Sequence, residues 1–495
     1  MKLVIRMRTK KTLYVLLVLG SFFLMSFAVI PIAPVKSANP TIKIGGLGPL
    51  AILPGKDMQN GMQLAVDEIN SAGGVTVGGT AYDLQSYYAT TSGSDGLPDT
   101  GKATTSLTTL KSDDNVVVMI GGFRTEVVVT VESQLGTVPF IGVGSTAPII
   151  TPYFWRAGPT NGSELALSLI EFYHVYMLAL GVRNITVVRE DADWSLAISK
   201  GIQGAFAAYF PNDNITFGND VVISTSATQD SVQSSLSPLK DSNTQAFLEL
   251  FSAPVGQFVT QAWANLNMTQ FLAGINVQAQ LSSYFQDTAG GAYGEIELET
   301  TAPNNNNPKA VAFRDAFDKK YGTYPTYTAY ASYDAVYILK QALEKCSSPT
   351  SDQIQTNLAT TDYNGTAFRT KFTAQVGPPQ YGVNSSGLPA EIQGVDYKTN
   401  ITVHDLYTPD GIGTSGNGYA NPVMVQWQKG GVKKEVYTDV ATFKSEGTTP
   451  LQWPINHSDS GYTSSNSSAP GFGLFGLFVA MSIFIGLKKH RKEKL

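Results

Sequence analysis

Between residues 42 and 345 the chain alternates short apolar runs with longer amphipathic stretches. The apolar runs have the length and flanking glycines of buried strands, while the stretches between them repeat apolar residues at helical spacing. The expected strands are Ile42–Leu47, Tyr82–Ala89, Val116–Ile120, Val138–Val143, Ile185–Val188, Val221–Ile223 and Ala246–Phe251; the expected helices are Met58–Ile69, Glu164–Leu180, Leu196–Phe210, Gln257–Leu266, Val311–Tyr321 and Tyr330–Lys345.

This alternation is typical of α/β units built on parallel sheets. Nearly 300 residues of it exceed what one sheet accommodates, so we expect two lobes, each a parallel sheet flanked by helices. Residues 375–420 are rich in Gly, Pro, Asn and Tyr, which predicts an extended insertion ending in a short strand at Val423–Trp427.

The two ends of the chain carry apolar segments beside basic residues. Five basic residues precede the apolar stretch Leu13–Val35, as in a secretory signal with cleavage between Ala33 and Asn39; the length of the stretch leaves an uncleaved anchor open. The second segment, Phe472–Leu487, has no charge and is followed by Lys488–Lys492. Sixteen residues cover about 24 Å as a helix, which predicts a slightly short transmembrane span with its basic end inside.

The charge distribution argues against nucleic acid as a partner. Charged residues make up 15% of the chain and the net charge is −5. Six basic residues lie in positions 1–38, and five with one acid in positions 488–495, which leaves 23 basic and 38 acidic residues between them, a net of −15. Such a domain lacks the basic footprint of a nucleic-acid binder. The single cysteine, Cys346, excludes internal disulfides and multi-cysteine metal sites.

No motif predicts an enzyme, a metal site or a cofactor. The phosphate-loop-like stretch Gly96–Ala103 ends in alanine where a hydroxyl would hold magnesium, so we interpret it as a loop capping the next helix. The GxGxxG match at Gly411–Gly416 lies in the loop-rich insertion, without a strand before it or a helix after it. His174 and His404 form no metal-spaced pair. His174 is interpreted as a packed core or surface histidine, and Cys346 as structural.

Several segments occur in the order found in the branched-chain amino-acid-binding proteins of ABC transporters. They are IKIGGLGPL (42–50), LAVDEINSAGG (64–74), VVVMIGG (116–122), VPFIGVGSTAP (138–148), FWRAGPTNG (154–162) and YASYDAVYILKQALEK (330–345). Over roughly residues 41–375 the chain resembles this family. The resemblance implies a type I periplasmic-binding fold, two α/β lobes joined by a three-stranded hinge and closing over an amino acid or similar small polar solute. It also implies an ABC permease as partner and no enzymatic activity.

The same resemblance implies where the ligand binds. Thr125, the backbone carbonyl of Gly144, and Thr146 with Ser145 beside it match positions that hold the ligand's carboxylate and amino groups. Both segments follow apolar strands, and ligands of open α/β sheets bind beyond the carboxyl ends of strands. Ordinary turn or cap chemistry is the alternative for these hydroxyls. In the second lobe Trp194 matches a lid aromatic.

Three further positions complete the expected site. Tyr327 and Tyr330 lie near another aromatic position of the family, with core packing as the alternative. Asn276 falls where the family carries the acid that pairs with the ligand's ammonium group. That exchange leaves an α-amino acid in question, unless Glu126 or Asp193 substitutes; an amide, a urea-like compound, a carboxylate or a peptide fragment remains open.

These observations predict a surface-anchored solute-binding protein. The tail APGFGLFGLFVAMSIFIGLKKHRKEKL also resembles the archaeal PGF-type surface-sorting signal, which implies a location on the extracellular face of the membrane. A receptor or sensor using the same cleft is the alternative, and an adhesive surface protein is a third class. The expected parts are a signal peptide or anchor at 1–38, a first lobe at 41–157 and 298–365, a second lobe at 158–297 and 366–455 with an insertion, a stalk at 456–470, a transmembrane or sorting helix at 471–487 and a basic cytoplasmic tail at 488–495.

Overall fold

The structure is a computed structural model that describes residues 39–94, 96–299, 307–376, 380–383, 389–392, 402–406, 422–438, 443–445, 447 and 451–462. The chain divides into residues 1–40 and residues 41–495, and everything below concerns the second unit. The expected N-terminal signal, the C-terminal helix and the GxGxxG match lie outside the described residues. Within those residues, no helix is both long enough and apolar enough to cross a bilayer.

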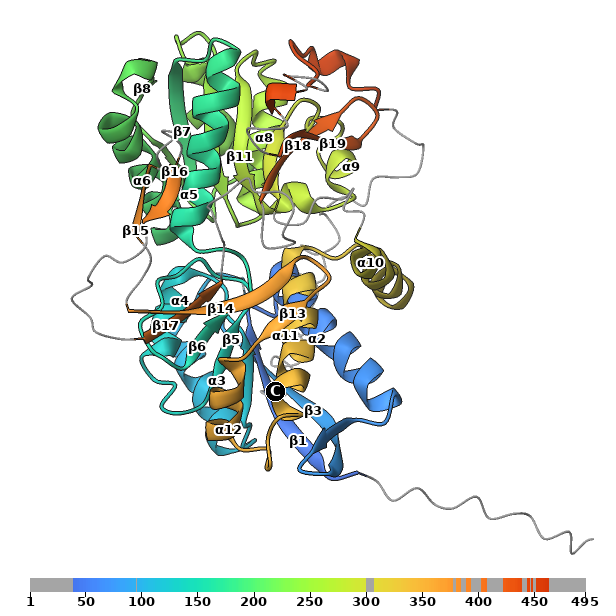
Figure 1. The fold of residues 1–495 in the computed structure, drawn as a ribbon. Helices are drawn as coiled ribbons and strands as arrows, with labels where there is room; N and C mark the ends of the chain where they lie inside the picture. The colour runs from blue at the N-terminus through green and yellow to red at the C-terminus, as the bar shows by residue number, and fades with distance from the viewer. Residues whose placement is uncertain are drawn as a thin grey trace, which may run out of the picture. The chain divides into compact units, whose positions relative to one another are not determined.

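The first lobe is built on a mixed sheet whose centre is parallel (Figure 1). β1 pairs in parallel with β3 and β4, and the parallel arrangement continues through β5, β6 and β17. Both edges are antiparallel. Among the described residues the strand order is β13 (Asp362–Asn364), β14 (Arg369–Val376), β17 (Thr402–Leu406), β6 (Phe154–Arg156), β5 (Phe140–Gly142), β4 (Val118–Gly121), β1 (Thr41–Gly48), β3 (Thr80–Thr90) and β2 (Val75–Val77).

The second lobe has a separate sheet with a parallel centre and one antiparallel edge. β7, β10, β11 and β12 pair in parallel, and β18 and β19 add the antiparallel edge beside β12. The described strands are β19 (Val432–Tyr437), β18 (Val423–Gln428), β12 (Ile296–Glu299), β11 (Phe271–Asn276), β10 (Ala246–Phe251), β7 (Asn184–Glu190), β8 (Thr216–Phe217) and, also on β7, β9 (Val221–Ile223). A separate hairpin joins β15 (Gln380–Val383) and β16 (Pro389–Ile392).

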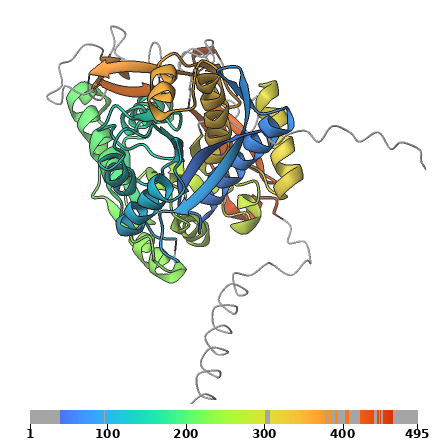
Figure 2. The same cartoon turned by 90° about the horizontal axis from the view of Figure 1, so that it is seen from below.

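Helices cover both faces of each sheet, and Figure 2 shows those of the first lobe on either side of its strands. In the first lobe α2 (Leu53–Ser71), α11 (Tyr327–Leu343) and α12 (Ser351–Leu358) pack on one face, α3 (Thr100–Ser112) and α4 (Thr125–Glu132) on the other, and α10 (Pro308–Tyr321) against α2 and α11. In the second lobe α5 (Gly162–Glu171), the π-helix η1 (Phe172–Met177) and α6 (Asp193–Tyr209) face α7 (Gln229–Leu236), α8 (Val255–Asn265) and α9 (Tyr284–Asp287) across the sheet.

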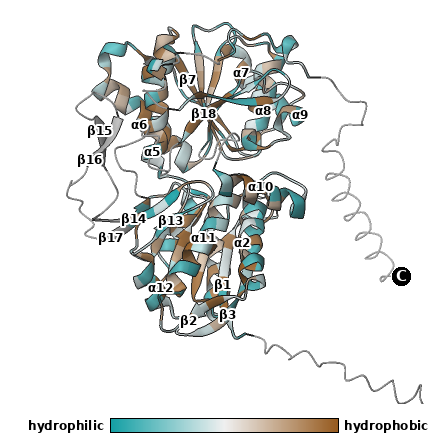
Figure 3. Cartoon of the chain, turned by 45° about the vertical axis from the view of Figure 1, so that its right-hand side comes forward, coloured by the Kyte–Doolittle hydropathy of each residue, from teal (hydrophilic) through white to brown (hydrophobic). Residues whose placement is uncertain are grey.

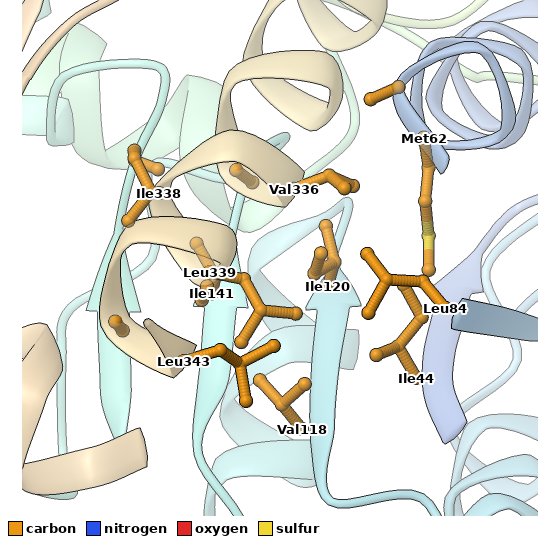
Figure 4. Packing of buried hydrophobic residues seen from close by; sticks show 14 of the residues in the cluster. Ile44, Met62, Leu84, Val118, Ile120, Ile141, Val336, Ile338, Leu339 and Leu343 are labelled. Carbon is orange, nitrogen blue, oxygen red and sulfur yellow. The ribbon is translucent and has the colours of Figure 1, made fainter. Parts of the chain in front are cut away.

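Strand periodicity determines which side chains meet which helices. On β4, Val118 and Ile120 pack with residues of α11, whereas Met119 between them belongs to the cluster on the opposite face. Figure 4 shows Val118 and Ile120 close to Leu339 and Leu343 of α11. In Figure 3 the strands at the centre of the second lobe are largely brown, which marks hydrophobic residues. The expected two-lobed α/β fold is therefore confirmed, and each expected strand and helix has a counterpart. The expected helix Glu164–Leu180 is α-helical as α5 up to Glu171 and continues as the π-helix η1.

Two strands of the insertion lie in a different lobe from the one expected. The sequence predicts residues 366–455 in the second lobe, but β14 and β17 join the first sheet beside β6, and only β18 and β19 join the second. Burial on β6 explains this placement. Arg156 is buried and its Nε lies 2.8 Å from Asp405 Oδ1 on β17, while His404 stacks on Trp155 with 3.7 Å between ring centroids. Burial lowers the pKa of His404 to about 4, so the ring stacks uncharged near neutral pH.

Candidate ligand-binding site

A cavity lies between the two lobes and is lined by residues from both. About 570 Å³ of empty space, open solvent included, lies between its lining atoms. The first lobe contributes Phe123–Thr125 after β4, Gly144–Thr146 after β5, and Tyr327 at the start of α11. The second lobe contributes Trp194 of α6, Ser252 after β10, and the ends of β11 and β12.

Glycines allow the two turns of the first lobe to pack against each other. Gly121, the last residue of β4, has φ +146°, and a Cβ there would lie 2.0 Å from Leu47 O. A Cβ at Gly144 would lie 2.5 Å from Gly122 O. Gly121 therefore lets the turn after β4 lie against β1, and Gly144 lets the turn after β5 lie against the turn after β4. The two turns present their polar groups to one space.

These turns supply hydrogen-bond donors to the cavity. α4 begins at Thr125 without a side-chain cap, so its first backbone N–H groups and the positive end of its dipole lie at the cavity wall. Within the described part of the chain, the hydroxyls of Thr125 and Thr146 have no hydrogen-bond partner in the protein, whereas Ser145 Oγ accepts from Ala147 N at 3.1 Å. Thr125, Ser145 and Thr146 therefore lie together, as the sequence predicts.

Tyr327 lines another side of the cavity and donates a hydrogen bond to the carbonyl oxygen of Gly144. Its Oη donates to Gly144 O at 3.2 Å, and its backbone N–H donates to Gln280 Oε1 of the second lobe at 3.4 Å. Burial raises the pKa of Tyr327, so the phenol keeps its proton and remains a donor. Tyr327 is thus a residue of the cavity and a contact between lobes.

Beneath the second-lobe wall, Glu190 organises the polar groups. This residue ends β7 and is fully buried. Oε1 accepts from Trp194 Nε1 and from Ser252 Oγ, both at 2.6 Å. Oε2 accepts from the backbone N–H groups of Ser252 at 2.9 Å and Ala253 at 2.7 Å. These four hydrogen bonds hold the indole of Trp194 and the loop after β10 in place at the cavity.

Arg124 joins the lobes across the cavity. Its Nη1 donates to Glu190 Oε1, its side chain is 7% exposed, and its backbone adopts φ 69°, which is uncommon for a residue with a Cβ. Neither Arg124 nor Glu190 is among the site residues that the sequence predicts. A usable signal exists, because each is a charged residue at the carboxyl end of an apolar strand in a chain with few charges.

Asn276 and Tyr330 do not line this cavity. Ile275 and Val277 do, but the Asn276 side chain between them turns to the other side, where its Nδ2 donates to Tyr284 Oη at 2.9 Å and Glu295 Oε1 at 3.1 Å. The prediction that Asn276 contacts the ligand is therefore wrong. Side chains alternate between the two faces of a strand, and that of Asn276 points into a buried cluster. Tyr330 lines a neighbouring space with Arg314 and Lys433, which shares the wall formed by Gln280 and Tyr327.

Among the described residues no aspartate or glutamate lines the cavity. The two acids proposed as substitutes, Glu126 and Asp193, are absent from its wall, although Glu126 Oε2 is buried without a partner. The same residues contain no group of three or more His, Cys, Asp or Glu placed to hold a metal ion. His174 lies elsewhere, with its Nδ1 2.6 Å from Asp213 Oδ2, and Cys346 is buried at the end of α11.

Two α/β lobes with a partly polar cavity between them define a ligand-binding protein of the periplasmic type. The chain belongs to the periplasmic binding protein family, whose sequence profile matches residues 41–384. It is 25% identical over 345 residues to the Leu/Ile/Val-binding protein homolog 7 of Brucella abortus strain 2308, covering 62% of this chain and 78% of that protein. The corresponding Brucella suis protein is 24% identical over 349 residues, covering 63% and 79%.

Solved structures show the same fold. The branched-chain amino acid transporter substrate-binding protein LivJ of Streptococcus pneumoniae, in complex with isoleucine, superposes with a TM-score of 0.59 at 18% identity, covering 80% of this chain and 99% of that one. A solute-binding protein of an ABC transporter from R. palustris, in complex with benzoate, gives a TM-score of 0.58 at 15% identity, covering 80% and 96%. At these identities the likeness establishes the fold.

Proposed function

We propose that this protein captures a small organic solute in the cavity between its lobes and delivers it to the permease of an ABC importer. The observation that carries this proposal is the cavity itself, whose wall combines Thr125 and Thr146 of one lobe with Trp194 and Ser252 of the other. A ligand in this position contacts both lobes at once. Its binding energy therefore favours the closed arrangement, which is the state that a transporter can recognise.

Relatives and fold neighbours support an amino acid or another carboxylate as the ligand, whereas the amide rests on the sequence alone. The Brucella relatives are named for leucine, isoleucine and valine, and the two solved neighbours hold isoleucine and benzoate. All of these compounds join a carboxylate to a hydrocarbon body. The N–H donors at the start of α4 suit the carboxylate, and the apolar wall of the cavity suits the hydrocarbon body.

The proposed location is the extracellular face of the cell membrane. Its support comes from the sequence: a basic and apolar N-terminal segment typical of secretion, and an apolar segment at Phe472–Leu487 followed by basic residues. A binder held at the membrane keeps its solute close to the permease. Membrane fractionation of cells that produce the full chain, beside a chain ending at Ser468, tests this part separately.

A thermal-shift screen of the full-length chain against amino acids, amides and carboxylates tests the binding proposal. A ligand at about 100 times its Kd adds about 2.7 kcal/mol to the free energy of unfolding, which is a measurable shift. Thr146→Phe, which fills the cavity, should abolish that shift, while Thr108→Phe on the exposed face of α3 should keep it. If no compound shifts the wild-type melting temperature, the proposed function is wrong.

A further inference from the structure

The charges of the cavity are unequal, and this asymmetry restricts what it can hold. Arg124 is the cation in the described lining, and no acid accompanies it there. The guanidinium has five N–H donors, and in the described residues its side chain makes one hydrogen bond to the protein, to Glu190. Arg124 therefore brings further donors to the cavity wall, beside the hydroxyls of Thr125 and Thr146 and the start of α4.

Glu190 cannot serve as the counter-charge of a ligand ammonium group. A carboxylate has about four lone-pair sites. The two oxygens of Glu190 already accept from Arg124, Trp194 Nε1, Ser252 Oγ and two backbone N–H groups. The residue is fully buried behind the wall, so a ligand reaches neither oxygen without breaking this network.

A second acceptor, a backbone carbonyl, is neutral and has a single lone pair left for an ammonium group. The carbonyl of Gly144 accepts the phenol of Tyr327, whose raised pKa keeps it a donor. An ammonium group taken from water into this space would lose its hydration without gaining a carboxylate partner, at a cost that exceeds a typical hydrogen bond.

The rest of the wall is hydrocarbon. The side chains of Phe123, Leu165, Ile275, Val277 and Leu298 line the cavity, and Trp194 presents its ring with the indole N–H turned to Glu190. A branched or cyclic hydrocarbon body fits this surface, and burial of that body supplies the affinity that the polar end does not.

We propose that the cavity selects a monocarboxylate with an apolar body and no ammonium group, and that Arg124 is the residue that determines this specificity. The inference rests on the proposed function and adds the ligand class to it. The carboxylate binds where Arg124, Thr146 and the start of α4 converge. Because Arg124 also donates a hydrogen bond to Glu190, the same guanidinium binds both the ligand carboxylate and the second lobe.

Three compounds with the same hydrocarbon body test the inference: 4-methylpentanoate, L-leucine and 4-methylpentanamide. Their Kd values for the full-length chain are measured by calorimetry. The carboxylate should bind at least about tenfold more tightly than the amide, since a hydrogen bond to a charged group is the stronger one. It should also bind more tightly than L-leucine, which carries the uncompensated ammonium group.

Arg124→Met tests whether Arg124 binds the carboxylate, by the ratio of the affinities for 4-methylpentanoate and 4-methylpentanamide. This variant weakens closure for every ligand, but the carboxylate-to-amide ratio should fall to about one only if Arg124 binds the carboxylate. Arg124→Lys should retain part of the ratio, and Arg369→Met, which alters an exposed pair on β14, should leave it unchanged. If Arg124→Met does not fold, the wild-type order of the three compounds tests the ligand class, and a reduced ratio in Arg124→Lys tests the role of Arg124.

The outcomes separate the inference from the function. Tighter binding of L-leucine or of the amide than of the carboxylate overturns the inference and leaves solute binding intact; it would direct attention to Glu126, whose Oε2 is buried without a partner. A carboxylate preference that survives undiminished in Arg124→Met overturns the role of Arg124. If neither these three nor any compound of the screen binds, the proposed function and the inference both fail.

Discussion

The guanidinium of Arg124 in the first lobe donates a hydrogen bond to the buried carboxylate of Glu190 in the second. The two partners differ in how they are held. Glu190 has four further donors, all from its own lobe, whereas Arg124 stands on a backbone turn at the start of α4. Glu190 is therefore held by its own lobe, and Arg124 is the donor that it receives from the other lobe.

This difference predicts opposite effects for the two residues. Glu190→Met removes the acceptor of five donors and should lower the free energy of unfolding by about 3–5 kcal/mol. Arg124→Met leaves Glu190 with its four other partners and should act mainly on ligand affinity. Denaturant unfolding of both variants beside ligand titration measures the contrast. Equal losses of stability would show that Arg124 is as much a part of the folded lobe as Glu190.

Thr146 should matter for affinity and little for stability. Its hydroxyl lines the cavity without a partner among the described residues. A hydrogen bond to a charged ligand group contributes about 1.5–3 kcal/mol, so Thr146→Val should weaken binding by about 10- to 150-fold. Thr108→Val on the exposed face of α3 is the matched control and should bind like wild type. If Thr146→Val instead lost stability and bound the ligand as tightly as wild type, Thr146 would be a turn residue and not a ligand-binding residue.

Gly121 should tolerate no side chain. Gly121→Ala places a Cβ 2.0 Å from Leu47 O at φ +146° and should cost about 3 kcal/mol or more, through strain and displacement of the turn after β4. Gly79→Ala, at φ +83° with no atom within 4 Å of the new Cβ, should cost only about 1–2 kcal/mol. Thermal unfolding compares them. Similar melting temperatures would mean that the β4 turn relaxes freely.

Buried carboxyl groups of the second lobe should make stability fall as pH rises. Burial raises the pKa of Glu295 to about 7, and the pKa of Glu249 is raised by burial and by its neighbour Glu295. Since the folded state of Glu295 holds its proton more tightly than the unfolded state, the associated stability is complete below about pH 4.5 and is lost as pH rises to about 7.

Glu295→Gln tests this directly. The change removes the buried charge while keeping an oxygen for Asn276 Nδ2, so the decline of the melting temperature between about pH 5 and about pH 8 should become shallower. Part of the slope should remain, because burial also raises the pKa of Glu132 to about 8 and of Asp334 to about 7. The exposed Glu344→Gln is the control, and an equal slope in wild type and Glu295→Gln would contradict the assignment.

Periodicity in the sequence was sufficient to predict the lobes, because buried strands and the helices between them depend on local apolar spacing. It failed at β14 and β17. Their place beside β6 depends on the buried pair of Arg156 and Asp405, which are 249 residues apart in sequence. Only the folded chain shows that this charge on β6 has its partner in the insertion.

The candidate site divides in the same way. Thr125, Gly144 and Thr146 follow strands whose carboxyl ends meet at one edge, so local reasoning found them. The prediction for Asn276 is wrong because successive residues of β11 point to opposite faces of the sheet. A motif resemblance does not fix the position of a residue to within one, so it does not tell which face Asn276 occupies. Glu190 was missed because its importance comes from donors on α6 and after β10, which adjacent sequence does not contain.

A small solute that binds between the lobes should hold them closed. Trp194 lies in the cavity wall with its indole N–H on Glu190, so its fluorescence reports on both events. The direct measurement is a fluorescence titration of the full-length chain with the compound selected by the thermal-shift screen, beside Trp194→Phe and Thr146→Phe. The account predicts a saturable change in wild type that is lost in both variants. A change of equal size and midpoint in Thr146→Phe would contradict it, because the ligand would then bind outside the cavity.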